Sequence, residues 1–160
     1  MSSYFDGFFA CDLKADVPQQ VIETLQYMTR TEEYTFTNVP DDKFFKDADW
    51  KDFLRPPQDY RVAPGWIGSE LNKMTRYISG TETEDYYTIS FRRSMHDDHE
   101  WGVLWWDFLF WIVQHSDMNG YVGYYREKYA QHPTLIYFQD GNVHWLRISE
   151  TPERLDPWSE

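Results

Sequence analysis

The clearest structural signal in the chain spans residues 134–148 and reads TLIYFQDGNVHWLRI. Its β-branched and aromatic residues flank Asp140-Gly141, a dipeptide that favours the two-residue turn of a β-hairpin. The sequence therefore predicts antiparallel strands at residues 134–139 and 142–148.

Further strand patterns precede this hairpin. Residues 121–128 predict a strand directly upstream, and residues 71–79 and 86–93 predict a second hairpin joined by a loop at residues 80–85. At the N-terminus, residues 4–13 are rich in aromatic residues and alternate between two faces. The sheet is thus expected to contain about five to six strands.

Two main helices are predicted between these strands. The first is expected to begin at Asp16 as N-cap, with Pro18 in its first turn, and to continue through Arg30. The second is expected to begin at a Ser94 cap and to run to about His115. We predict an α+β fold, in which an antiparallel sheet of about five to six strands carries the two main helices packed on one face.

The length of 160 residues suits one domain. We expect residues 1–150 to form a single globular α+β domain and residues 151–160 to form a weakly ordered C-terminal tail. The proline-rich segment at residues 31–64 carries several aromatic rings, which predicts that it is held against the core rather than free.

The excess of acidic residues indicates which kinds of partner the chain can bind. Twenty-seven acidic residues against 15 Lys and Arg give a formal charge of −12, which disfavours direct nucleic-acid binding and favours a basic protein partner. The single cysteine, Cys11, cannot form a disulfide within the chain and indicates a reducing, cytoplasmic location. The longest apolar run is too short for a membrane span, so no membrane association is expected.

No motif identifies an enzyme. The segment from His96 to Glu100 lacks the spacing of a metalloprotease helix, and helix capping accounts for its acidic residues. Cys11 alternates with Phe9 and Leu13 as a buried residue would, and the glycine-rich phosphate loops are missing. The sequence therefore predicts no catalytic residue, no metal and no cofactor, and favours a non-enzyme.

The acidic residues gather in two groups, one in the proline-rich segment and one in the predicted loop of the first hairpin. We predict that they contact the basic partner, either directly or as a nucleic-acid mimic. The predicted partner-binding residues are Asp41, Asp42, Asp47, Asp49, Asp52, Glu82, Glu84 and Asp85.

These features favour a non-catalytic acidic protein-binding module, of the type of an inhibitor, immunity or anti-defence protein that blocks a basic nucleic-acid-binding or toxin surface. The alternative is a small-ligand-binding or enzymatic domain with an aromatic-lined pocket, in which Asp107, His115 or His144 supplies the polar group. A homodimer could coexist with either function, held by the aromatic surface of residues 101–113 or by an exposed sheet edge.

Overall fold

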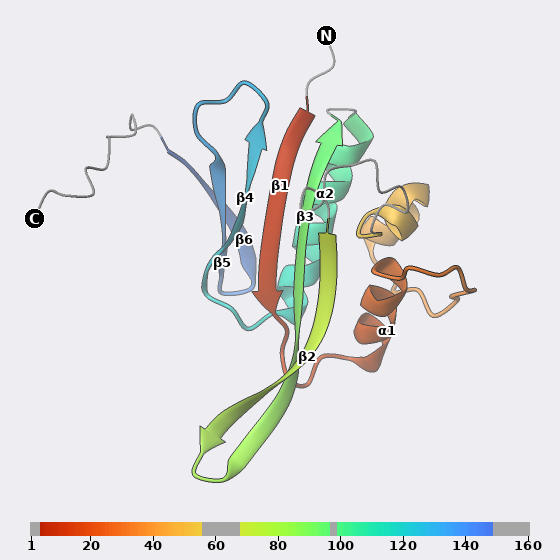
Figure 1. The fold of residues 1–160 in the computed structure, drawn as a ribbon, viewed down its shortest axis with the longest axis vertical. Coiled ribbons are helices and arrows are strands. Elements are labelled where there is room, and N and C mark those ends of the chain that lie inside the picture. The colour runs from red at the N-terminus through yellow and green to blue at the C-terminus, as the bar shows by residue number, and fades with distance from the viewer. Residues whose placement is uncertain (1–3, 56–67, 97–98, 149–160) are drawn as a thin grey trace, which may run out of the picture.

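The computed structural model describes residues 4–55, 68–96 and 99–148 (Figure 1). The strands are β1 (Tyr4–Asp12), β2 (Gly68–Ser79), β3 (Glu82–His96), β4 (Gly120–Glu127), β5 (Thr134–Gln139) and β6 (Asn142–Arg147). The helices are α1 (Gln19–Met28) and α2 (His99–Ile112), with 3₁₀ helices η1 (Lys43–Lys46), η2 (Ala48–Asp52) and η3 (Val113–His115). The predicted tail at residues 151–160 lies outside the described residues.

The strands form one six-stranded sheet in the order β2-β3-β1-β4-β5-β6, and every neighbouring pair is antiparallel. This arrangement confirms the predicted α+β class and the strand number. Among the described residues, β2 and β6 are therefore the two edges of the sheet. None of the helices in the described part of the chain has the length and apolar content that a bilayer crossing requires.

The β5–β6 hairpin forms as predicted, with Gln139 opposite Asn142 across the turn. The two turn residues, Asp140 and Gly141, have φ angles of 51° and 74°. Left-handed φ angles at both positions are what a two-residue hairpin turn requires, and Asp-Gly tolerates them well.

The β2–β3 hairpin is longer than the sequence predicted. The expected loop at residues 80–85 is wrong, because only Gly80 and Thr81 separate the two strands. Arg76 pairs across the ladder with Glu84, and Thr75 pairs with Asp85. Opposite charges on directly paired residues stabilise a ladder whose polar sequence resembles a loop.

The predicted start of the second helix at Ser94 is also wrong. Ser94 lies in β3 and pairs with Asp6 of β1, and the following residue, Met95, is buried. Because β1 offers a long partner, the strand continues to His96 and α2 begins only at His99. The first helix likewise begins at Gln19 with Pro18 as its N-cap, so Asp16 lies before it.

The core lies on one face of the sheet, where α2 packs behind β1 and β3 (Figure 1). Phe9 of β1 is fully buried, and its ring centroid lies 5.8 Å from that of Phe108 of α2 and 5.7 Å from that of Phe138 of β5. Because side chains alternate between the two faces of β1, Phe9 points to the core face, where it joins an aromatic cluster with Phe108 and Phe138.

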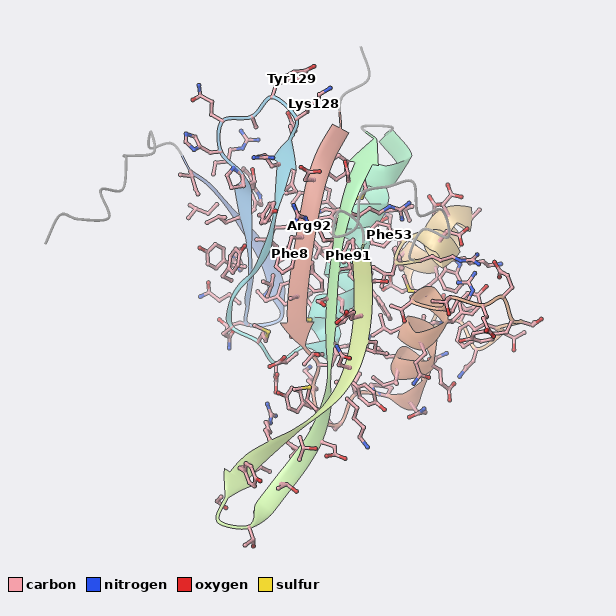
Figure 2. The ribbon with its side chains drawn as sticks, in the orientation of Figure 1. Phe8, Phe53, Phe91, Arg92, Lys128 and Tyr129 are labelled. Atoms are coloured by element: carbon pink, nitrogen blue, oxygen red, sulfur yellow. The ribbon has the colours of Figure 1, made fainter. Side chains whose placement is uncertain are left out.

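The segment around η1 and η2 closes this cluster. The ring centroid of Phe53 lies 5.4 Å from that of Phe91 of β3 (Figure 2). The ring centroid of Phe44 lies 5.5 Å from that of Phe108. These contacts confirm that the described part of the irregular segment is held against the core. Helix α1 contacts η2 through Tyr27, whose ring is 5.7 Å from that of Trp50.

Gly123 allows β4 to approach β1 closely. An added Cβ there would lie 2.0 Å from the backbone oxygen of Phe8, a group that cannot rotate away. We therefore expect Gly123→Ala to lower the free energy of unfolding by about 3 kcal/mol, as overpacking does. Denaturant unfolding monitored by tryptophan fluorescence measures this loss.

The matched control is Gly102→Ala in α2, where an added Cβ meets nothing within 4 Å. Alanine favours the helix, so this variant should be unchanged or more stable by up to about 1 kcal/mol. Equal stability of Gly123→Ala and the unmodified protein would contradict the close approach of the two strands.

Candidate partner-binding surfaces

The eight predicted acidic residues occupy two separate places. Five of them, between Asp41 and Asp52, lie in and around η1 and η2, whereas Glu82, Glu84 and Asp85 lie on the β2–β3 hairpin. Figure 1 shows the hairpin turn and the η1–η2 segment well apart. The structure therefore does not join the two groups into one acidic surface.

Two residues of the first group are helix caps. A carboxylate oxygen of Asp42 accepts a hydrogen bond from the Phe44 amide at 2.9 Å, and one of Asp47 accepts from the Asp49 amide at 2.8 Å. Each bond satisfies an amide at the start of a 3₁₀ helix, so these carboxylates have a local structural role. Asp41 lies 3.8 Å from the Lys46 ammonium, and both side chains are highly exposed.

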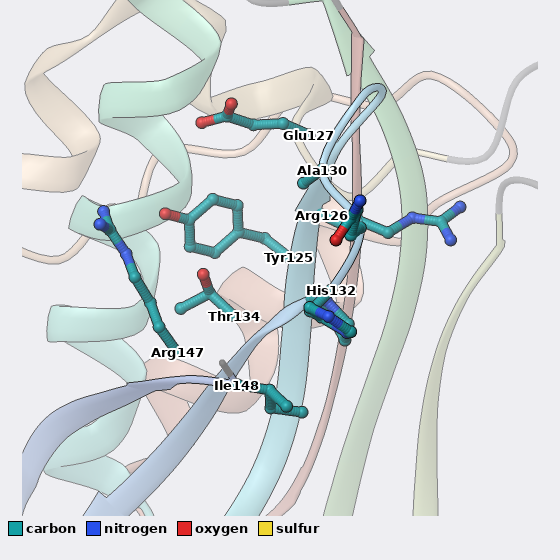
Figure 3. Close-up of a pocket in the computed structure, with 10 residues that line it drawn as sticks. Tyr125, Arg126, Glu127, Ala130, His132, Thr134, Arg147 and Ile148 are labelled. Carbon is teal, nitrogen blue, oxygen red and sulfur yellow. The ribbon is translucent and has the colours of Figure 1, made fainter. Parts of the chain in front are cut away.

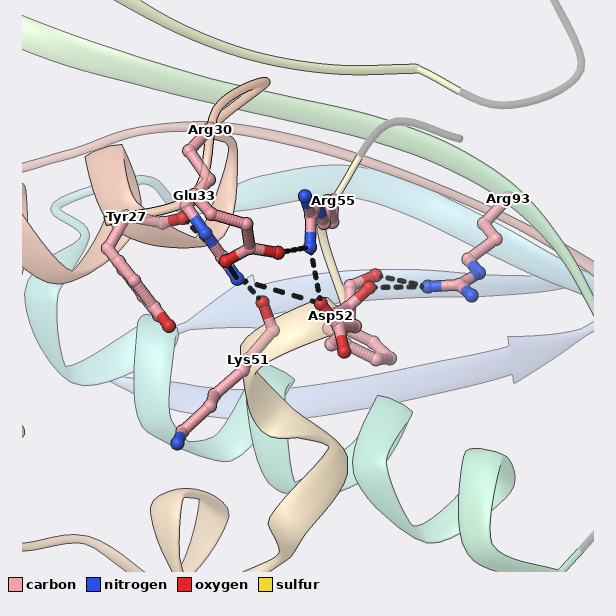
Figure 4. Close-up of polar contacts among 8 residues, drawn as sticks. Tyr27, Arg30, Glu33, Lys51, Asp52, Arg55 and Arg93 are labelled. Carbon is pink, nitrogen blue, oxygen red and sulfur yellow. Dashed lines mark hydrogen bonds and ion pairs between the residues drawn. The ribbon is translucent and has the colours of Figure 1, made fainter. Parts of the chain in front are cut away.

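Asp52 belongs to a cluster of ion pairs that joins the end of α1 to η2 (Figure 4). Its carboxylate lies 3.7 Å from Arg30 and 3.5 Å from Arg55, and both arginines also pair with Glu33. The Arg30 side chain is only 5% exposed and donates to the carbonyl of Lys51 at 3.0 Å. The hydrogen bond from Arg55 is the main cause of the lowered pKa of Glu33.

Two acids of the hairpin group are paired along the ladder. Asp85 accepts from Thr75 at 2.8 Å and lies 2.9 Å from the Lys73 ammonium, whose hydrogen bond lowers the pKa of Asp85. Glu84 lies 2.8 Å from Arg76. Glu82 and Asp49, by contrast, are exposed and form no ion pair with any other described residue.

The end of the hairpin forms an apolar surface that sequence reasoning missed. The β1 ladder reaches only Thr88 of β3, so residues 74–86, which we call the ribbon, are two strands without a third neighbour among the described residues. In this ribbon Tyr77 is 81% exposed and Ile78 is 55% exposed, and Met74 is exposed as well. Figure 1 shows the ribbon extending beyond the rest of the sheet.

A hollow of about 300 Å³ lies at the end of β4 and β5 (Figure 3). Tyr125, Thr134 and Arg147 point to one side of the sheet, whereas Arg126, His132 and Ile148 point to the other. Among the described lining residues Glu127 is the single carboxylate. This arrangement gives little support to a catalytic pocket, in which polar groups converge on one point.

The polar residues of the alternative prediction are not brought together. Asp107 forms an ion pair with Lys43 at 2.9 Å. His115 packs edge-on against Trp111, and burial lowers its pKa. His144 is exposed on β6 and lines a shallow hollow with Tyr137. The three residues therefore have different surroundings and do not form one site.

The paired acids are expected to stabilise the fold. Arg30→Ala removes a buried cation that joins α1 to η2, so we expect the free energy of unfolding to fall by about 2 to 4 kcal/mol. Asp49→Asn, at an exposed unpaired acid, should change it by less than about 0.5 kcal/mol. Chemical denaturation of both variants tests this, and equal effects would contradict a structural role for the cluster.

Cys11 is expected to be unreactive in the folded protein. It is buried, and burial raises its pKa to about 12, so the reactive thiolate is scarce at neutral pH. Modification by a disulfide reagent should require unfolding, so at a given pH it should be far slower in native buffer than in denaturant, where the thiol regains its ordinary pKa. Rapid labelling of the native protein would show that the thiol is accessible.

Comparison of the chain with protein-family models, with curated proteins and with solved structures gives no match. Function must therefore be inferred from the geometry of the chain itself. The feature that stands out is a surface rather than a catalytic cluster: the ribbon, with apolar side chains exposed at one end of the sheet.

Proposed function

We propose that this chain is a non-catalytic protein-binding module that engages its partner through the ribbon, residues 74–86. The observation that carries the proposal is the exposure of Tyr77, Ile78 and Met74 on β2, where β3 is the only strand among the described residues that pairs with it. Apolar side chains grouped in this way mark interaction sites more often than isolated ones do. An inhibitor or immunity-type protein that blocks a basic surface remains the biological role that we predict.

The ribbon is suited to insertion into a groove of a partner. Two cross-strand ion pairs hold its strands in register: Arg76 with Glu84 within the ribbon, and Lys73 with Asp85 at its base. The Arg76 guanidinium also lies 4.9 Å from the ring centre of Tyr86. A surface that is ordered before binding loses less conformational entropy when the complex forms, which increases affinity.

The acidic charge has a separate part in this proposal. Glu82 lies beside the turn of the ribbon, and the whole chain carries a formal charge of −12. Such a field attracts a basic partner and speeds association, whereas buried apolar anchors mainly slow dissociation. We therefore expect Tyr77 and Ile78 to provide most of the affinity and the unpaired acids to steer the encounter.

The test combines cross-linking with substitution. A photoreactive amino acid in place of Tyr77 should cross-link a discrete protein in a lysate of the source organism. The double variant Tyr77→Ala/Ile78→Ala should bind that protein roughly tenfold to a hundredfold more weakly, since aromatic anchors commonly contribute about 2 kcal/mol or more. Surface plasmon resonance with the purified partner should show the loss mainly in the dissociation rate.

Tyr129→Ala is the matched control. Tyr129 is a similarly exposed tyrosine in the β4–β5 connection, far from the ribbon (Figure 2). This variant should bind the partner like the unmodified protein. The double variant Glu82→Lys/Asp49→Lys should mainly lower the association rate and make that rate less dependent on salt. Unchanged partner binding by the Tyr77→Ala/Ile78→Ala variant would refute the ribbon as the binding element.

A further inference from the structure

The two edge strands of the sheet differ in their protection against pairing with another strand. Strand β2 carries Glu70, Lys73 and Arg76, and its register shifts between Tyr77 and Ser79. Charged side chains and irregularities of this kind hinder the addition of a further strand. Strand β6 has one arginine, Arg147 at its end, but no acid, lysine or proline, and it pairs with β5 without a register shift.

The outer edge of β6 also has apolar side chains on both of its faces. Trp145 is 58% exposed and Leu146 is 54% exposed. Successive residues of a strand point to opposite faces, and Trp145 pairs with Ile136, whose buried side chain belongs to the core face. Trp145 therefore lies on the α2 face of the sheet and Leu146 on the opposite, open face.

Apolar surface continues inward from the edge on both faces. On α2, Val103, Trp106 and Phe110 recur at helical spacing, and Trp106 packs edge-on against Tyr125 of β4 with ring centroids 5.4 Å apart. This stripe therefore faces the β4–β6 half of the sheet, and its Phe110 is exposed. On the open face, the Tyr121 and Tyr137 rings pack together at 5.9 Å.

We propose that β6 pairs in antiparallel orientation with β6 of a second copy of this chain, so that the two sheets become continuous. The two-fold axis that relates the copies is normal to the sheet, so a given residue points to the same face in both copies. Directly opposed residues share a face, and faces alternate along a strand, so one residue must lie opposite its own copy. We place this axis at His144, so that His144 lies opposite His144 of the second copy. Val143 then lies opposite Trp145 of the second copy, and Asn142 opposite its Leu146.

Charge complementarity favours a second copy as the occupant. The chain as a whole repels itself, with a formal charge of −12, so self-association has to use a surface without clustered acids. Strand β6 is such a surface. The same register places Arg147 opposite Gly141 of the second copy, next to Asp140 in the turn, so that two cation–carboxylate contacts flank the paired strands.

The decisive experiment is a cysteine trap at the axis. Residues directly opposite each other in antiparallel strands have Cα atoms about 4.5 to 5.5 Å apart, within the range of a disulfide. His144→Cys should therefore form a covalent dimer under mild oxidation, seen on a non-reducing gel. Native Cys11 is buried and does not compete. Asn142→Cys, on the same face of the same strand, is the control, and it should not cross-link to its own copy.

The second measurement is the association constant by sedimentation equilibrium. Leu146→Lys changes both copies at the interface and should weaken the dimer roughly tenfold or more, whereas Met74→Lys, on the opposite edge strand, should leave it unchanged. A chain that stays monomeric at all accessible concentrations would overturn the proposal, as would a dimer lost on Met74→Lys but kept on Leu146→Lys. Since the ribbon is not part of the β6 interface, a monomeric chain would leave the proposed function unaffected, whereas loss of the dimer on Met74→Lys would place the ribbon itself between two copies.

Discussion

The fold depends above all on the packing of Phe9 in the central strand β1. Its ring is fully buried among Phe91, Phe108 and Phe138, so one contact set joins β1 to β3, α2 and β5. Gly123 supports this arrangement by letting β4 approach the β1 backbone. The chain is 19% aromatic, and large rings with a specific geometry pack at the centre of the core.

A core concentrated behind the central strands leaves the ends of the sheet with little cover. The ribbon extends past the last β1 pairing, and β6 forms the far edge with Trp145 and Leu146 exposed. Both of the interaction surfaces that we propose therefore lie where the sheet extends beyond its central packing. Such surfaces combine rigidity from the backbone ladder with freely accessible side chains.

Local pattern was sufficient for much of the secondary structure. Alternation predicted β1, and Asp140-Gly141 predicted the β5–β6 turn, because period and turn chemistry act over a few residues. The errors at residues 80–85 and at Ser94 have one cause: a polar or capping sequence became a strand because a long antiparallel partner was available. The acidic groups were visible in the sequence, but the partners of Asp52 and Asp85 were not.

The sequence by itself determined the α+β class, the buried position of Cys11, the excess of acidic charge and the main hairpins, since composition and short-range periodicity encode these properties. Only the tertiary structure decided the strand order and, with it, which strands became edges and which acids became ion pairs. These are contacts between distant segments, such as Arg30 with Asp52 across 22 positions of the chain. Their free energy depends on how the whole core packs, which no local pattern specifies.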